Sequence, residues 1–196
     1  MEVERARAKK SYLARSRSKR FKGPKISKAV YGKEMVTKLS YSYAASASSG
    51  LYTAVIPLVS TLQASNDWAN YAASYQNFNI LKVKIQYVPC GQAGATPNAI
   101  RALGICYTVK DNNAVTNLNQ IADHTNYTIW GLNYAGPNKL FFKVNARPKI
   151  RPPQSTADTT ENFGWIKHYS TDIGNSGSNP IGYFVYTFSV AFSGES

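Results

Sequence analysis

Eleven lysine and arginine residues gather near the start of this sequence, with no acidic residue among them. Such a density of cations suits the neutralisation of phosphates, because each contact releases a counterion that the nucleic acid had condensed. We therefore interpret residues 1–30 as a basic arm that binds nucleic acid. Two alternatives are a solvated tail that adds solubility, and a segment on a membrane surface, for which the wide apolar face is missing. The cations are Arg5, Arg7, Lys9, Lys10, Arg15, Arg17, Lys19, Arg20, Lys22, Lys25 and Lys28.

Residues suited to catalysis or metal binding are few. His124 and His168 are the only histidines, and neither lies in a metal-ligand pattern, so we expect both at a surface or interface with satisfied hydrogen bonds. Cys90 and Cys106 could pair, but two isolated cysteines in a β domain are more often free and buried, which indicates intracellular synthesis. No serine has a nucleophile elbow around it, and no phosphate-binding loop is present. We predict no catalytic residue, no metal and no cofactor.

The charge is concentrated at one end of the 196 residues, whose formal net charge is +13. Residues 1–38 hold 13 basic and three acidic residues. Within them, residues 5–28 contain so few apolar side chains that we expect this stretch to be disordered when free. Only 17 of the other 158 residues are charged, whereas about a quarter are charged in ordinary domains. Interface cores are depleted of charge, so we expect much of the body's surface to contact other chains. No apolar run approaches the roughly 18 residues of a membrane span.

The body, residues 31–196, has the pattern of short strands separated by turn-rich segments. Helical spacing predicts two short helices, within 66–76 and 114–123. This order predicts an all-β fold, an eight-stranded single jelly roll of two packed four-stranded antiparallel sheets with short helical insertions. The strands are expected near residues 35–43, 51–59, 78–88, 99–109, 126–130, 139–146, 163–169 and 181–192.

The strand at 78–88 carries the clearest alternation. Leu81, Val83, Ile85 and Tyr87 are expected to face the opposite sheet, because successive side chains of a strand point to opposite faces. The other face is expected to carry a second set, which includes two lysines. That set is Phe78, Ile80, Lys82, Lys84 and Gln86.

Several segments resemble parts of single-jelly-roll capsid proteins. Residues 71–75 (YAASY) lead through Phe78 into 80–89, like a helix feeding a strand that ends in proline. Residues 104–113 resemble the next strand and its acidic turn, and 141–152 resemble the basic, proline-marked segment late in the domain. With the basic arm, the order of elements most resembles capsid proteins of small circular single-stranded DNA viruses that encode a replication initiator, a circovirus-like group.

This resemblance implies a structural protein of the virion that assembles with itself, about 60 copies forming a closed T=1 icosahedral shell. With the net charge of +10 that residues 1–38 carry, about 60 copies would then bring on the order of 600 positive charges to a packaged genome. In such capsids the strand at 78–88 lies in the sheet nearer the shell interior, so Lys82 and Lys84 are expected to face the nucleic acid. The run Arg15–Lys25 fits a nuclear address, which implies import receptors as partners and assembly in the host nucleus.

Two alternatives stay open at this point. Small satellite RNA viruses share the same plan, so the genome could be DNA or RNA. A cellular nucleic-acid-binding β-barrel is the second alternative, although such a module carries basic and aromatic residues together on an exposed face. The host, the cell-surface receptor and the triangulation number do not follow from the sequence.

Overall fold

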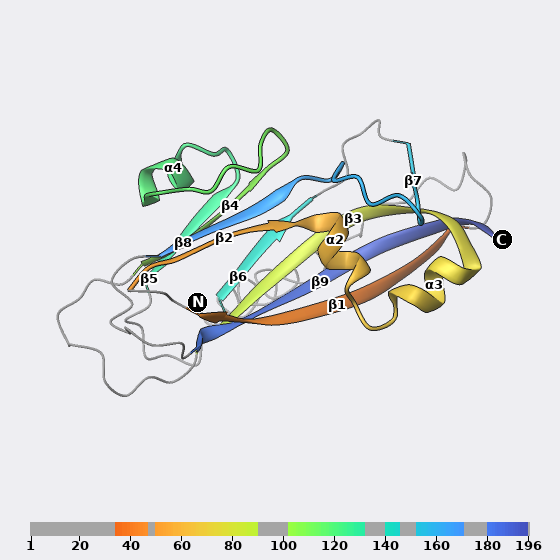
Figure 1. Cartoon of the computed structure of the whole chain (residues 1–196), viewed down its shortest axis with the longest axis horizontal. Coiled ribbons are helices and arrows are strands. Elements are labelled where there is room, and N and C mark those ends of the chain that lie inside the picture. Colours follow the sequence, from red (N-terminus) through yellow and green to blue (C-terminus); the bar gives the residue numbers. More distant parts are fainter. Residues whose placement is uncertain are drawn as a thin grey trace, which may run out of the picture. The chain divides into compact units, whose positions relative to one another are not determined.

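Two antiparallel β-sheets make up the described part of the chain (Figure 1). The computed structural model describes residues 34–46, 50–89, 102–131, 140–145, 152–170 and 180–195, all within the unit Gly32–Ser196. The eleven arm cations lie outside these residues, as does Cys90.

The first sheet contains the longest strands. It runs in the order β1, β9, β3, β6, and the two-residue strand β7 pairs with the other end of β3. Its strands are β1 (Met35–Ser46), β9 (Pro180–Glu195), β3 (Tyr75–Pro89), β6 (Leu140–Val144) and β7 (Gln154–Ser155).

The second sheet runs in the order β2, β8, β4, β5. Every pair in both sheets is antiparallel. Apart from β7, the pairing is nested: β1 with β9, β2 with β8, β3 with β6 and β4 with β5, which is the winding of a jelly roll. The predicted fold is confirmed. The strands are β2 (Tyr52–Pro57), β8 (Trp165–Ser170), β4 (Ala102–Thr108) and β5 (Tyr127–Gly131).

The core forms where β9 and β3 present large side chains to the second sheet. Five residues of β9 point inward in strict alternation, and each lies opposite an inward residue of β3. Burial of each such side chain stabilises the fold by roughly 1.5–3 kcal/mol. The pairs are Phe192 with Phe78, Val190 with Ile80, Phe188 with Val83, Tyr186 with Ile85, and Phe184 with Tyr87.

A β-bulge at Leu81 changes the alternation of β3. Ile80 pairs with Val190 and Lys82 pairs with Ser189, so Leu81 has no partner on β9. The extra residue brings Phe78 and Ile80 to the core, where both are fully buried, whereas simple alternation predicted them beside the lysines. Leu81 is half-buried at the bulge, so its predicted place among the core residues is also wrong.

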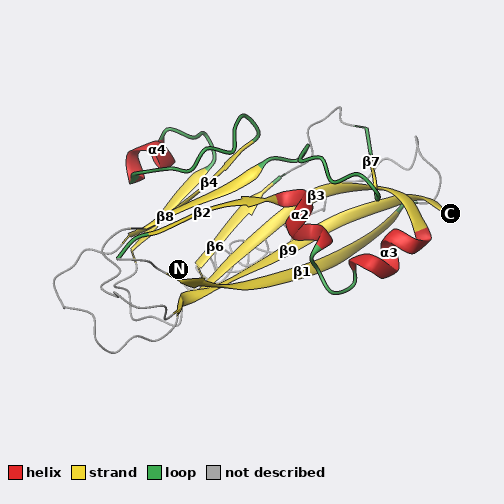
Figure 2. Cartoon of the chain, viewed as in Figure 1, coloured by secondary structure: helices red, strands yellow, loops and turns green. Residues whose placement is uncertain are grey.

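Among the described residues, three short helices lie outside the two sheets (Figure 2). The strand expected at 51–59 ends at Pro57, where α2 (Leu58–Gln63) begins and buries Leu58, Val59 and Leu62. The Val59 N–H donates to the Glu161 carboxylate at 2.8 and 3.0 Å, a contact from 102 residues away that no local pattern reveals. None of the described helices is long and apolar enough to cross a membrane.

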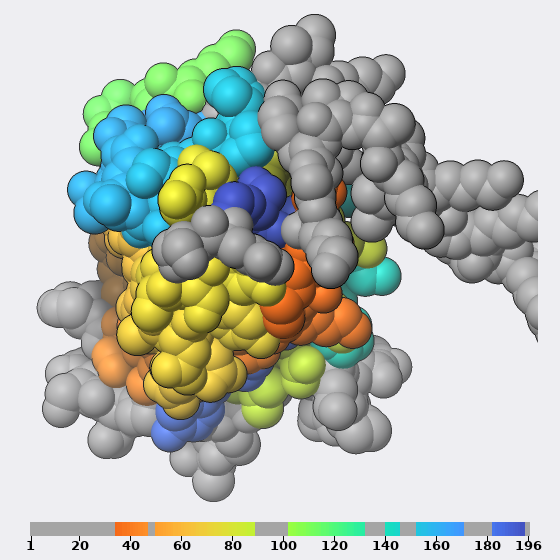
Figure 3. Space-filling view, turned by 90° about the vertical axis from the view of Figure 1, so that its right-hand side faces the viewer, coloured from red at the N-terminus to blue at the C-terminus, as the bar shows by residue number. Residues whose placement is uncertain are grey.

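The predicted helix at 66–76 is α3 (Trp68–Ser74), which ends because Tyr75 already pairs in β3. The Trp68 ring meets the ring of Phe78 edge-on at 5.0 Å, and Tyr71 stacks on Phe192 at 5.0 Å. Figure 3 shows the yellow surface around α3 beside the orange surface of β1. The helix expected at 114–123 is the five-residue α4 (Leu118–Ala122), with Asn117 as its N-cap.

His168 lies in the core, which corrects the expectation of a surface or interface histidine. It is fully buried on β8, and its Nε2 lies 2.7 Å from the Tyr186 hydroxyl of the facing sheet. The Tyr43 and Tyr52 hydroxyls are hydrogen-bonded nearby at 2.7 Å. Nδ1 of His168 has no hydrogen-bond partner in the described structure, and burial lowers the pKa of the imidazole to about 3.

We predict that His168 makes the fold less stable in acid. The unfolded chain binds this proton near pH 6.5 and the native chain near 3, so the free energy of unfolding should fall as pH decreases between these values. The loss should reach about 1.4 kcal/mol per pH unit. A His168→Phe variant should lose this slope, because phenylalanine has no proton to bind. Denaturant titrations from pH 7 to 4 measure the difference, and parallel curves for both proteins would contradict the prediction.

Candidate nucleic-acid interface

The outer face of the first sheet carries four lysines, and we call it the lysine face. Its strands alternate, so the residues between the core positions point away from the second sheet. The described outward residues of these strands, taken between positions 36 and 191 of the sequence, include no aspartate or glutamate. The lysines are Lys38 of β1, Lys82 and Lys84 of β3, and Lys143 of β6.

Lys82 and Lys84 are placed as the sequence predicts, on the side of β3 away from the core. Lys82 is exposed and Lys84 is half-buried, while Val83, Ile85 and Tyr87 between and beyond them are fully buried. The bulge at Leu81 does not disturb this part, because the alternation from Lys82 onward is regular.

Sequence reasoning missed Lys38 and Lys143, both of which are exposed. Each lies between inward-facing residues of an alternating strand, Lys38 between Thr37 and Leu39 and Lys143 between Phe142 and Val144, so the alternation alone indicated that both point outward. The alternation within one strand could not give the register between neighbouring strands. Lys38 and Lys82 flank Ser189 from either side, and Lys143 lies directly opposite Lys84.

The Lys84–Lys143 pair places two like charges directly opposite each other on this face. Like charges directly opposite each other in antiparallel strands destabilise a sheet. Lys84 turns its ammonium over the ring of Phe141, 4.0 Å from the centroid, which is a cation–π contact of modest strength at an exposed site. No carboxylate of a described residue pairs with any of the four lysines. An anionic partner would relieve the repulsion.

Hydroxyl and amide groups lie between the lysines. Ser189 separates Lys38 from Lys82, and Thr187 lies next to Lys84 on β9. Gln86 follows Lys84 on the same face of β3 and is half-buried. Such side chains donate hydrogen bonds to phosphate and sugar oxygens in nucleic-acid interfaces.

The outer face of the second sheet is different, because the chain covers the part of it that β4 and β8 form. The segment from 109 to 126 crosses β4 and β8 and includes α4 (Figure 1). Ile121 and Val115 pack there against Cys106 and Tyr169. Cys106 is a buried free thiol, and burial raises its pKa to about 11.

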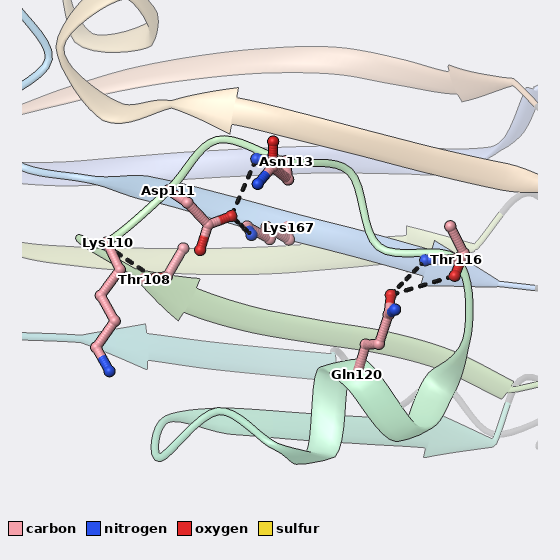
Figure 4. Close-up of polar contacts among 7 residues, drawn as sticks. All are labelled: Thr108, Lys110, Asp111, Asn113, Thr116, Gln120 and Lys167. Atoms are coloured by element: carbon pink, nitrogen blue, oxygen red, sulfur yellow. Dashed lines mark hydrogen bonds and ion pairs between the residues drawn. The ribbon is translucent and has the colours of Figure 1, made fainter.

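The lysine of this second face has a carboxylate partner. Lys167 is buried, and its Nζ lies 2.6 Å from Asp111 Oδ1, which also accepts the Asn113 N–H (Figure 4). The hydrogen bond from Lys167 lowers the pKa of Asp111. Half-buried His124 lies near this pair, and burial lowers its pKa. The two sheets therefore differ: the lysine here is neutralised within the chain, whereas the lysine face is open.

Among the described residues, no group of three or more histidine, cysteine or acidic side chains could hold a metal ion. The eleven arm cations lie outside the described residues, so the structure brings together only Lys82 and Lys84 of the residues proposed to bind nucleic acid.

Comparisons with known proteins identify the fold. No family model and no curated protein matches the sequence. Solved viral capsid structures do match in shape: tobacco necrosis virus (TM-score 0.63, 13% identity, 84% of this chain and 97% of that chain) and cocksfoot mottle virus (0.60, 10%, 84% and 97%). A virus-like particle of the prawn Macrobrachium rosenbergii nodavirus also matches (0.52, 14%, 86% and 98%). The chain therefore has the jelly-roll fold of viral capsid proteins.

We predict that Lys82→Ser and Lys84→Ser together weaken the binding of single-stranded nucleic acid and leave the fold intact, since neither residue is in the core. If each lysine contacts one phosphate, the slope of log affinity against log salt should fall by about 0.7 per lost contact. Filter binding of the full chain over a salt series measures this slope.

Lys110→Ser is the matched control, because Lys110 is an exposed lysine that follows β4 of the second sheet. It removes one exposed lysine outside the lysine face and should leave the slope unchanged, whereas the Lys82→Ser, Lys84→Ser variant lowers it. Equal slopes for all the variants would reduce Lys82 and Lys84 to ordinary surface charges.

Proposed function

We propose that this chain is a viral capsid protein that assembles into a T=1 icosahedral shell and packages a single-stranded genome. The arm of residues 1–30 neutralises phosphates, and the lysine face extends its positive surface. The bound genome is proposed to be DNA, with the RNA of a small satellite-type virus as the alternative. The protein acts as a structural component of the virion and not as an enzyme.

The observation that carries this proposal is the pairing of a capsid-type jelly roll with an open face of unpaired lysines. In the fold itself, positive charge could lie on either outer surface. Here Lys167 of one sheet is paired with Asp111, whereas the four lysines of the other sheet have no described carboxylate partner. A closed shell has one surface that meets its cargo, and this sheet is the one suited to it.

The finer parts of the proposal rest on the sequence. The solved structures reported above come from tobacco necrosis virus, cocksfoot mottle virus and a prawn nodavirus, none of which is named as a circovirus-like virus. They therefore do not favour DNA over RNA. The run Arg15–Lys25 supports entry through nuclear import receptors and assembly in the host nucleus. A cellular nucleic-acid-binding module remains the competing function, and it would not form closed shells.

Negative-stain microscopy of the expressed full chain tests assembly. We predict closed particles of uniform size that protect nucleic acid from added nuclease. Sequencing the protected material with and without prior deoxyribonuclease or ribonuclease distinguishes DNA from RNA. Monomers or small oligomers under every salt and pH condition would contradict the capsid proposal.

Deletion of residues 1–30 should remove most nucleic-acid binding. The arm holds eleven of the chain's 23 cations, so the salt slope should fall by several units, whereas the far-ultraviolet circular dichroism of the β domain should persist. An arm with its lysines and arginines changed to glutamine is the length-matched control and should behave like the deletion. An unchanged slope in both variants would show that the arm is not the main contact.

A further inference from the structure

Two large aromatic side chains lie exposed on the lysine face. Phe141 of β6 is 39% exposed and Tyr183 of β9 is 45% exposed, although their neighbours Phe142 and Phe184 are buried in the core. The alternation of each strand makes this outward position definite. Neither ring belongs to the core that holds the two sheets together. In the isolated chain the exposed part of each ring therefore adds no burial energy to the fold.

The strand register places both rings among polar and charged groups. Phe141 lies directly opposite Gln86, two residues from Lys143 along β6, and its ring faces the Lys84 ammonium at 4.0 Å. Tyr183 lies opposite Val88 on β3, one outward position beyond Gln86. The two rings thus stand on strands that flank β3, and the lysines lie to one side of them.

This combination is the one that single-stranded nucleic acid requires. Lysines along a strand attract the phosphate backbone, and exposed aromatic rings offer flat surfaces on which unpaired bases stack. Stacking needs no particular base, because every base has a π face. A duplex keeps its bases stacked on each other and would contact the lysines alone.

We propose that Phe141 and Tyr183 are base-stacking residues, so that the lysine face binds single strands in preference to duplexes. In this arrangement a base takes a place on the Phe141 ring, and the Lys84 ammonium moves from the ring to a phosphate. The proposal rests on the proposed function, in which this face meets the packaged genome, and it adds a contact that phosphate neutralisation does not supply.

The test compares strands of equal length and charge that differ in base or in sugar. The full chain is titrated with oligothymidylate, with oligouridylate and with an abasic deoxyribose strand of equal length and charge. The ratio of the first affinity to the third isolates the contribution of the bases, and the thymidylate–uridylate comparison separates DNA from RNA. Phe141→Leu with Tyr183→Leu should lower the thymidylate-to-abasic ratio by about fivefold or more, since one stacked base is worth at least that factor.

Tyr127→Leu is the matched control. Tyr127 of β5 is 46% exposed, but it lies on the second sheet, so its loss should leave the ratio unchanged. The Lys82→Ser, Lys84→Ser variant should weaken binding to the base-containing and abasic strands alike. An unchanged ratio in the leucine variant would overturn the stacking proposal while the lysine result keeps the proposed function. No effect of the lysine variant on any strand would instead overturn the role of this face.

Photo-cross-linking of the unmodified chain is independent of whether the variants fold. Strands that contain 5-iodouracil react with aromatic side chains in stacking contact, and mass spectrometry locates the adducts. Adducts at Phe141 or Tyr183 support the proposal. Adducts found only in the arm or on the second sheet would contradict the proposal. Leucine variants that keep their base dependence but form altered particles would assign the two rings to another contact.

Discussion

The structure depends on the packing of one strand, β9, between β1 and β3. Its inward row of Phe184, Tyr186, Phe188, Val190 and Phe192 is buried throughout and meets the inward row of β3 residue by residue. A shift of register by one residue would exchange every core side chain for a surface one, so this packing specifies the register strongly. The outward row is then fixed as well. Tyr183, Thr187 and Ser189 point outward because their neighbours point inward, and the lysines of the flanking strands follow.

Two titratable groups, His168 in the core and half-buried Glu161, have opposing effects on stability. Burial lowers the pKa of His168, so the free energy of unfolding decreases as pH falls below about 6.5. Burial raises the pKa of the Glu161 carboxyl to about 7, although backbone N–H groups of α2 favour its charged form. The native chain therefore holds that proton more tightly than the unfolded chain, and the free energy of unfolding falls as pH rises from about 4.5 to 7. Between these limits the two contributions partly offset each other.

Local patterns in the sequence were sufficient for the class of fold, eight of the nine described strands and the outward direction of Lys82 and Lys84, since alternation is a local property. They failed where a distant contact decides. Leu58 and Val59 look like the end of a strand, yet Glu161 caps a helix there. His168 lacked a visible partner because Tyr186 reaches it from the facing sheet. Lys143 gained its meaning only from its register with Lys84, which depends on the pairing of β3 with β6.

The bulge at Leu81 has a consequence for how this strand tolerates changes in length. Removal of Leu81 would leave Ile80 followed directly by Lys82, and these residues would still face Val190 and Ser189 in unbroken alternation. Loss of Val83 would instead invert the part of β3 that follows it relative to β9 and turn Lys84 toward the core. A one-codon deletion in the gene is therefore tolerable at Leu81, where it would cost chiefly the local twist that a bulge adds.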